Sequence, residues 1–168
     1  EEFVRIYGLG KIPAATPRAE IVLGADDSRT RAIQACRSNL MALGLRETMN
    51  YSFVADRLED LLEPAGAPGR VVLPNPVNLE QSILRDTLIP QMVDTLGRNL
   101  AHQQREAALY ELGRVFCQHA DGKTSEEERL TIGLMGPVGR AGLDRRRSTE
   151  REEVFLWIKG IWESLAAI

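Results

Sequence analysis

Two adjacent carboxylates, Glu1 and Glu2, are the first side chains of this sequence that could do chemistry. Hard metal cations prefer oxygen ligands such as carboxylates, so this pair has the right chemistry for part of a hard-metal site. The same pair also fits the solvated surface of a helix, and the residues alone favour that second interpretation. Both alternatives stay open at this point.

Other residue types with catalytic potential lack the spacing that their chemistry needs. The chain has 2 histidines, His102 and His119, and no cluster of cysteine and histidine with the spacing of a zinc site. No serine lies in a Gly-x-Ser-x-Gly turn that would expose a nucleophile. The repeated glycines from Gly133 to Gly139 lack the lysine of a phosphate-binding loop and indicate a turn. We therefore expect no catalytic and no cofactor-binding residue in this chain.

Composition indicates a globular domain. The chain has 168 residues, 43% of them hydrophobic, and a formal net charge of −3. Cys36 and Cys117 lie far apart, which fits reduced thiols in the cytoplasm better than a disulfide framework. The sequence has no hydrophobic run long enough to span a bilayer and no signal peptide. Because it begins without methionine and ends within a helical pattern, we expect a piece of a longer protein.

The basic run Arg145 to Arg147 and the acidic stretch from His119 to Glu128 could be contact patches. Runs of charge are more often solvated loops, and no aromatic residue accompanies the arginines to stack on bases. A nucleic-acid-binding domain is therefore a weaker alternative. It predicts an affinity that falls steeply with salt.

The stretch from Asn75 to Leu100 is the centre of the expected fold. Asn75-Pro76 indicates a turn, and Pro90 suits the first turn of a helix. Ile89, Val93, Leu96 and Leu100 have helical spacing and predict the buried stripe of that helix. Gly97 within it suggests another backbone passing close by.

The rest of the chain predicts alternating helices and strands around this centre. The expected helices cover 1–7, 29–43, 56–63 and 154–167, and the expected strands cover 45–53, 71–73, 108–116 and 130–135. In the strand 45–53, the polar side chains from Arg46 to Ser52 share one face, which either meets water or lines a cleft, and water is the first expectation. The prolines between Lys11 and Pro17 indicate a domain boundary.

Several of these segments resemble one family. Glu1 to Gly8, followed by Ile12-Pro13, resembles the junction after the preceding DNA-binding-like domain in the beta subunit of bacterial phenylalanine–tRNA ligase. Motifs further along continue the resemblance in the family's order: Gly44 to Phe53 ending in Tyr-Ser-Phe, Asn75-Pro76, Leu84-Arg85 with Leu88-Ile89-Pro90, Asn99, Tyr110 to Phe116, and Lys159-Gly160. The terminal helix departs from the family, because Val154 and Trp157 stand where it usually has acidic residues.

The resemblance implies an α+β fold like the class II aminoacyl-tRNA synthetase core, an antiparallel sheet flanked by helices and truncated at the C-terminus. Residues 1–17 would be the end of a preceding domain and a linker, and residues 18–168 a catalytically silent core module. It further implies a heterotetramer of two alpha and two beta subunits, in which the catalytic alpha subunit attaches phenylalanine to tRNA-Phe with ATP. Glu1 and Glu2 match two ligands of the family's Mg²⁺ site.

The main alternative from another class is a self-sufficient class II ligase domain that binds ATP and an amino acid itself. Such a site needs an arginine on the strand after the central helix and a later glycine-rich motif ending in arginine. Neither is evident, because Arg114 alternates with Tyr110 and Phe116, and Glu111 and Gly113 occupy the opposite face. The silent module is therefore the leading hypothesis.

Overall fold

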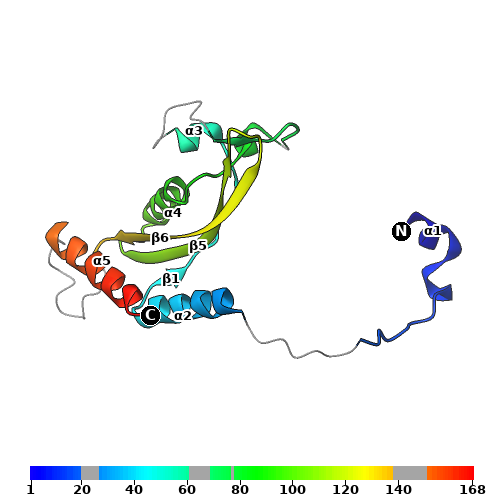
Figure 1. The fold of residues 1–168 in the computed structure, drawn as a ribbon, viewed down its shortest axis with the longest axis horizontal. Coiled ribbons are helices and arrows are strands. Elements are labelled where there is room, and N and C mark those ends of the chain that lie inside the picture. The colour runs from blue at the N-terminus through cyan, green and yellow to red at the C-terminus, as the bar shows by residue number, and fades with distance from the viewer. Residues whose placement is uncertain (20–26, 61–68, 77, 138–150) are drawn as a thin grey trace.

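The computed structural model describes residues 1–19, 27–60, 69–76, 78–137 and 151–168 (Figure 1). Its helices are α1 (Glu2–Tyr7), the 3₁₀ turn η1 (Leu9–Lys11), α2 (Ser28–Ala42), α3 (Asp56–Glu59), η2 (Leu79–Gln81), α4 (Ile89–Ala101) and α5 (Arg151–Ala166). Its strands are β1 (Arg46–Glu47), β2 (Phe53–Val54), β3 (Val71–Val72), β4 (Ile83–Leu84), β5 (Ala107–Gln118) and β6 (Thr124–Met135). None of the helices in this described part has the length and apolar character needed to cross a bilayer.

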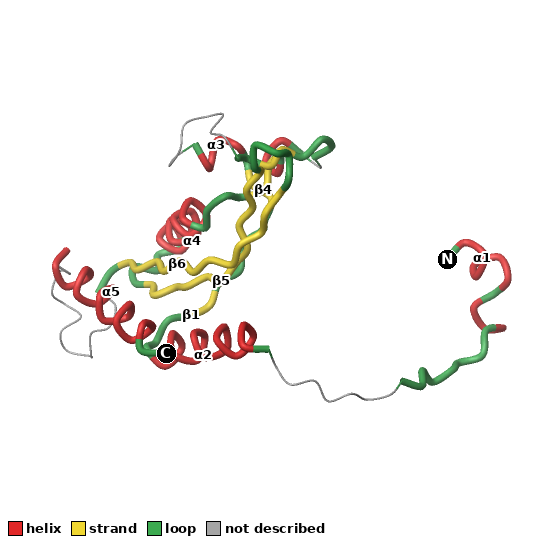
Figure 2. The backbone as a smooth tube through the Cα atoms, viewed as in Figure 1, coloured by secondary structure: helices red, strands yellow, loops and turns green. Residues whose placement is uncertain are grey.

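The strands form two small sheets. In the first, β5 lies between β1 and β6, and the long β5–β6 hairpin is antiparallel from Ala107↔Met135 to Gln118↔Thr124 (Figure 2). β1 pairs with β5 in the parallel direction, which makes this sheet mixed. In the second sheet, β4 lies between β2 and β3, and both pairs are antiparallel. The expected α+β architecture is confirmed, with one parallel pair added to it.

Helices cover both faces of the first sheet, as Figure 1 shows. On one face, the wholly buried Tyr110 packs with Leu40 of α2 and Ile161 of α5, and Leu45 completes this core. On the other face lies α4, whose Met92 is also buried. The alternation expected for β5 is therefore confirmed, since its even and odd residues meet different helices.

The expectation for α4 is right in extent and wrong in its buried face. Its first turn holds Pro90 as predicted, but Ile89, Val93 and Leu100 of the predicted stripe are about half exposed. The close approach suggested at Gly97 is also absent among the described residues, because a Cβ there would contact none of them within 4 Å. The glycine that lies tightly against α4 is Gly133 on β6, where a Cβ would lie 2.7 Å from Sδ of Met92. The close packing of α4 on the sheet therefore depends on a glycine of the sheet and not on a glycine of α4.

The strand expected over 45–53 is interrupted. Only β1 and β2 are paired strands, and Met49 and Tyr51 between them are 86% and 77% exposed. The polar face expected to meet water is partly turned inward, because the side chain of Asn50 hydrogen-bonds to Glu111 of β5, whereas Arg46 at its start is exposed. The cleft alternative is therefore correct at Asn50, which lines a pocket.

Smaller differences from the sequence prediction concern the β5–β6 hairpin, α5 and α3. The polar loop expected after β5 is a tight turn, and β6 begins at Thr124 because the glutamates after it continue the hairpin ladder. On α5, Trp157 joins Ile161 at the core, whereas Phe155 and Trp162 are 64% and 69% exposed. The short helix expected over 56–63 is described only as α3, since 61–68 lie outside the described residues.

Candidate functional site

A buried ion pair lies between α4 and β5. Nη1 of Arg85 is 2.7 Å from Oε1 of Glu111, and the two side chains are 3% and 2% exposed. The same nitrogen donates to Oε1 of Gln91 at 2.9 Å, and Nε of Arg85 donates to the carbonyl oxygen of Arg114 at 2.9 Å. A buried charge is tolerated when it is paired and hydrogen-bonded, and both conditions are met here.

The pair belongs to a wider polar network. Asn50 donates to Glu111 through its backbone N at 3.1 Å and through Nδ2 at 2.7 Å. Gln91 donates to the carbonyl oxygen of Tyr51 at 2.7 Å, and Thr95 donates to Oδ1 of Asn50 at 3.0 Å. The network joins β5, α4 and the segment between β1 and β2. It therefore fixes the position of Tyr51 and its neighbours relative to the sheet.

Local sequence explains how Arg85 reaches this place. Arg85 directly follows β4, and its backbone N donates to Ser52 while its carbonyl oxygen accepts from Phe116. Gly113 on β5 leaves room for the guanidinium, because a Cβ at this position would collide with Nη2 of Arg85. A glycine in a strand often marks such a close approach. The Leu84-Arg85 and Gly113 motifs thus meet at one point in space.

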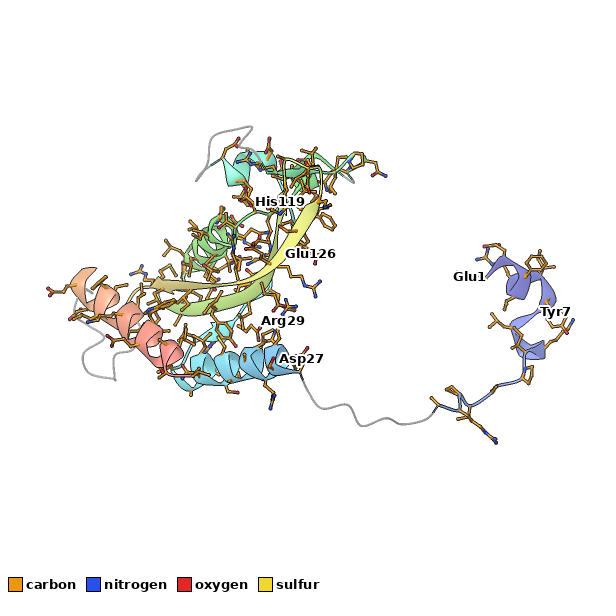
Figure 3. The ribbon with its side chains drawn as sticks, viewed as in Figure 1. Glu1, Tyr7, Asp27, Arg29, His119 and Glu126 are labelled. Carbon is orange, nitrogen blue, oxygen red and sulfur yellow. The ribbon has the colours of Figure 1, made fainter. Side chains whose placement is uncertain are left out.

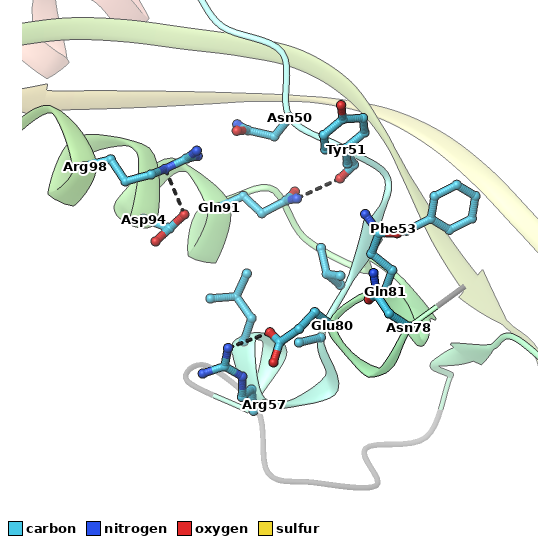
Figure 4. Close-up of a pocket in the computed structure, with 13 residues that line it drawn as sticks. Asn50, Tyr51, Phe53, Arg57, Asn78, Glu80, Gln81, Gln91, Asp94 and Arg98 are labelled. Atoms are coloured by element: carbon cyan, nitrogen blue, oxygen red, sulfur yellow. Dashed lines mark hydrogen bonds and ion pairs between the residues drawn. The ribbon is translucent and has the colours of Figure 1, made fainter. Parts of the chain in front are cut away.

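A pocket of about 480 Å³ opens beside this network (Figure 4). Polar, charged and apolar side chains line it, among them Asn50, Tyr51, Phe53, Arg57, Leu58, Asn78, Glu80, Gln91, Asp94 and Arg98. Its two arginines are engaged, since Arg57 pairs with Glu80 at 2.5 Å and Arg98 pairs with Asp94 at 3.2 Å. The mixed lining suits a small polar molecule or a partner side chain better than a polyphosphate, which needs uncompensated positive charge.

Arg114 does not face this pocket. It lines a different depression together with Ile33 and Arg37 of α2, and its guanidinium pairs with Glu126 of β6 at 3.1 Å. The expectation that Arg114 and Glu111 lie on opposite faces of β5 is therefore confirmed. Arg114 is also the single arginine of β5.

A second charged cluster holds α3 in place. Arg70, which precedes β3, pairs with Asp56 at 2.5 Å and Asp60 at 2.6 Å, and its Nε lies 3.9 Å from Asp86. Glu59 lies in the same cluster and is only 1% exposed. Burial first, then hydrogen bonding to Asp86 and the charge of that carboxylate, raise the pKa of Glu59 to about 8.

Glu2 begins α1 and Glu1 precedes it as the N-cap residue, and both lie apart from the body of the fold, as the labels of Glu1 and Arg29 in Figure 3 show. Both are exposed, and Glu2 pairs with Arg5 at 3.5 Å. Among the residues described, no three carboxylate, histidine or cysteine side chains gather as a metal site. The donor chemistry of Glu1 and Glu2 fits two ligands of a Mg²⁺ ion, and further ligands would have to come from outside the described residues.

The remaining sequence candidates contribute little to these sites. Cys36 and Cys117 are free cysteines, and burial raises the pKa of the Cys36 thiol, as expected for a residue packed at the core. Nε2 of His119 lies 2.8 Å from Oγ of Ser125 on the hairpin. Arg145 to Arg147 lie outside the described residues.

Sequence reasoning missed the residues that carry the buried charge. Glu111 and Gln91 stand among apolar neighbours on elements that were expected to be buried, and Glu59 follows the apolar Leu58 in the helix expected over 56–63. A charged residue on a buried face needs a partner. That mismatch was the available signal for Glu111 and Gln91, although it does not name the partner.

Comparisons with known proteins agree with this geometry. Residues 12–168 match the family model described as the phenylalanyl tRNA synthetase beta chain CLM domain. The chain is 34% identical over 168 residues to the phenylalanine–tRNA ligase beta subunit of Moorella thermoacetica, covering 98% of this chain and 20% of that protein. It is 37% identical over 176 residues to the beta subunit of Burkholderia pseudomallei, covering 99% of this chain and 21% of that protein. The chain thus spans about a fifth of these relatives.

Solved structures give the same fold. A pyrrolysyl tRNA synthetase from Desulfitobacterium hafniense superimposes with a TM-score of 0.60 at 15% identity, over 82% of this chain and 44% of that chain. A histidine–tRNA ligase subunit from Alicyclobacillus acidocaldarius superimposes with a TM-score of 0.53 at 14% identity, over 91% of this chain and 44% of that chain. At these identities the likeness concerns the fold alone.

Proposed function

This chain belongs to the family of phenylalanyl-tRNA synthetase beta-chain CLM (catalytic-like module) domains, and from that premise we propose that it is a non-catalytic structural and subunit-interaction module. It supports the ATP-dependent attachment of phenylalanine to tRNA-Phe by the catalytic alpha subunit. Its setting is a cytoplasmic heterotetramer of two alpha and two beta subunits. Residues 1–17 serve as the end of a preceding domain with a linker, and 18–168 form the module.

The observation that carries the proposal is that the arginines on the two faces of β5 are already paired with carboxylates. Forming an aminoacyl-adenylate brings a carboxylate against the alpha-phosphate, so a competent site must direct cations at the developing charge. On the face that α4 covers, Arg85 is already neutralised by Glu111. On the other face, Arg114 is paired with Glu126. Neither arginine offers uncompensated charge to a nucleotide.

A surface for the alpha subunit is supported by the segment between β1 and β2. Met49 and Tyr51 expose large apolar side chains, while Asn50 and Gln91 hold their backbone in place through the polar network. Exposed apolar side chains on a fixed backbone favour association, because little ordering is needed on binding. Met41 near the end of α2 is 56% exposed as well, so we place the alpha-subunit contact at the end of α2 and the segment that follows it.

Glu1 and Glu2 extend the proposal to a metal. They would supply two carboxylates to a Mg²⁺ ion of the complete ligase, and bound Mg²⁺ would neutralise negative charge at the start of α1. The pair of Glu2 with Arg5 is exposed and weak enough to be exchanged for such an ion.

Association with the alpha subunit tests this function. The chain should form a complex when mixed with the catalytic alpha subunit, measured by sedimentation velocity. The double variant Met49→Asp with Tyr51→Asp should weaken that complex, whereas Val72→Asp, at a position 67% exposed on the other sheet, should leave it unchanged. Absence of any complex with the parent chain would count against the interaction role. ATP-dependent activation of phenylalanine by the chain alone would favour the self-sufficient ligase instead.

A further inference from the structure

The side chain of Glu59 occupies an environment that a carboxylate does not tolerate. It is 1% exposed, and neither of its oxygens has a hydrogen-bond partner among the described residues when it is treated as a carboxylate. A buried charge without donors is costly, and a carboxyl group in this position takes up a proton instead. A protonated Glu59 becomes a donor, and Asp86, which lies beside Arg70 in the same cluster and contributes to the raised pKa of Glu59, is the available acceptor.

The charges around Glu59 favour the same conclusion. Asp56 at the start of α3 and Asp60 directly after the helix are both engaged by Arg70, which also lies near Asp86. The segments packed against α3 contribute the charged residues Arg70, Asp86 and Arg85. On α4, Asp94 and Arg98 also line the pocket, and they pair with each other. Arg85 is committed to Glu111. Four carboxyl groups therefore surround Arg70, and one proton relieves their repulsion.

We propose that a proton shared between Glu59 and Asp86 clamps α3 against the segment that leads into α4, and that this clamp loosens as the pH rises. The clamp has a structural consequence because α3 forms part of the pocket wall. Arg57 and Leu58, the two residues before Glu59, line the pocket, and Arg57 reaches across to Glu80 of η2. Loss of the proton therefore opens the pocket on the side of α3. This inference is independent of the proposed function.

The direction of the pH dependence follows from proton linkage. Burial and Asp86 raise the pKa of Glu59 from 4.5 to about 8. At pH values between these two, the folded chain therefore keeps a proton on Glu59 that the unfolded chain has lost. Stability is therefore highest below the lower value and decreases as the pH rises through the window. One such proton changes the unfolding constant up to about tenfold per pH unit.

Denaturant unfolding at a series of pH values tests the clamp. Between about pH 6 and about pH 8 the unfolding constant of the parent chain should rise, whereas Glu59→Gln, which keeps a neutral side chain of the same shape, should remove most of that rise. Glu127→Gln, at an exposed residue of β6, should keep the parent slope. Amide exchange over 56–60, corrected for the intrinsic pH effect, should accelerate in the parent and not in Glu59→Gln. Equal slopes in the parent and Glu59→Gln would overturn the proposal.

Two further measurements do not depend on the folding of Glu59→Gln. The Glu59 carboxyl carbon, followed by NMR in the parent chain, should titrate near pH 8, and a titration at an ordinary carboxyl value would reject the clamp. In Asp86→Asn that titration should move to lower pH, because the facing charge is removed. A cation could also neutralise the pair. If added Mg²⁺ stabilises the parent at about pH 9 but does not stabilise Glu59→Gln, a bound metal ion and not a shared proton neutralises the pair, and the proposal is overturned.

Discussion

Arg114 and Glu111 lie three positions apart on β5 and on opposite faces of the sheet, Arg114 beside α2 and Glu111 against Arg85 beneath α4. A residue pair that must act together on one nucleotide cannot be divided by the sheet in this way. We expect the chain alone to show no phenylalanine-dependent exchange of pyrophosphate into ATP, and Arg114→Ala to change nothing. Exchange above background that Arg114→Ala abolishes would promote the self-sufficient ligase.

The buried ion pair should be sensitive to removal of one partner. Arg85→Met leaves Glu111 charged and buried, which should destabilise the chain by about 3–5 kcal/mol. Pairing the change with Glu111→Leu should recover part of this loss, although Asn50 then loses its acceptor. Arg129→Met, which removes an exposed pair with Glu127, should cost only about 0–1 kcal/mol. Denaturant unfolding measures all three, and equal costs for Arg85→Met and Arg129→Met would contradict this account.

Leu40 is the core residue that joins α2 to the sheet and α5. It is 0% exposed, so Leu40→Ala should reduce the free energy of unfolding by about 2–5 kcal/mol. If α2 belongs to the alpha-subunit contact, the same variant should also weaken association. Leu156→Ala on α5 is the control, since Leu156 is 56% exposed. An unchanged stability together with unchanged association for Leu40→Ala would reject the role given to this helix.

The metal proposal predicts a loss of binding and not of fold. In the complete ligase, replacing Glu1 and Glu2 together by Gln should lower Mg²⁺ occupancy, measured by isothermal titration, because two oxygen ligands lose their charge. The matched control replaces Glu126 and Glu127, which are also adjacent and exposed. Occupancy that is the same in both double variants would show that Glu1 and Glu2 are not ligands.

The sequence predicted the main elements because their signals are local. Pro90 and the following periodicity defined α4, and alternation around Tyr110 defined β5. The buried face of α4 could not be predicted in the same way, since Ile89 and Val93 are more apolar than Gln91, yet Gln91 is buried. Its burial depends on Arg85, which precedes the helix, and on the carbonyl oxygen of Tyr51, which is remote in sequence, and helical periodicity takes account of neither. Two-residue strands such as β1 have no periodicity of their own and exist through their long-range pairs.

The parallel pairing of β1 with β5 sets an order of folding events. Its partners Arg46 and Leu109 are about sixty residues apart, whereas the β5–β6 hairpin closes over the few residues between Gln118 and Thr124. Closing the longer loop costs about 2 kcal/mol more entropy, so the hairpin should form first and β1 should join it late in folding. In pulse-labelling exchange, amides of the hairpin should gain protection before the amide of Thr48, which donates to Tyr110. The segment proposed to meet the alpha subunit is then the last edge of the sheet to close, so a partner that binds it acts on the final step of folding.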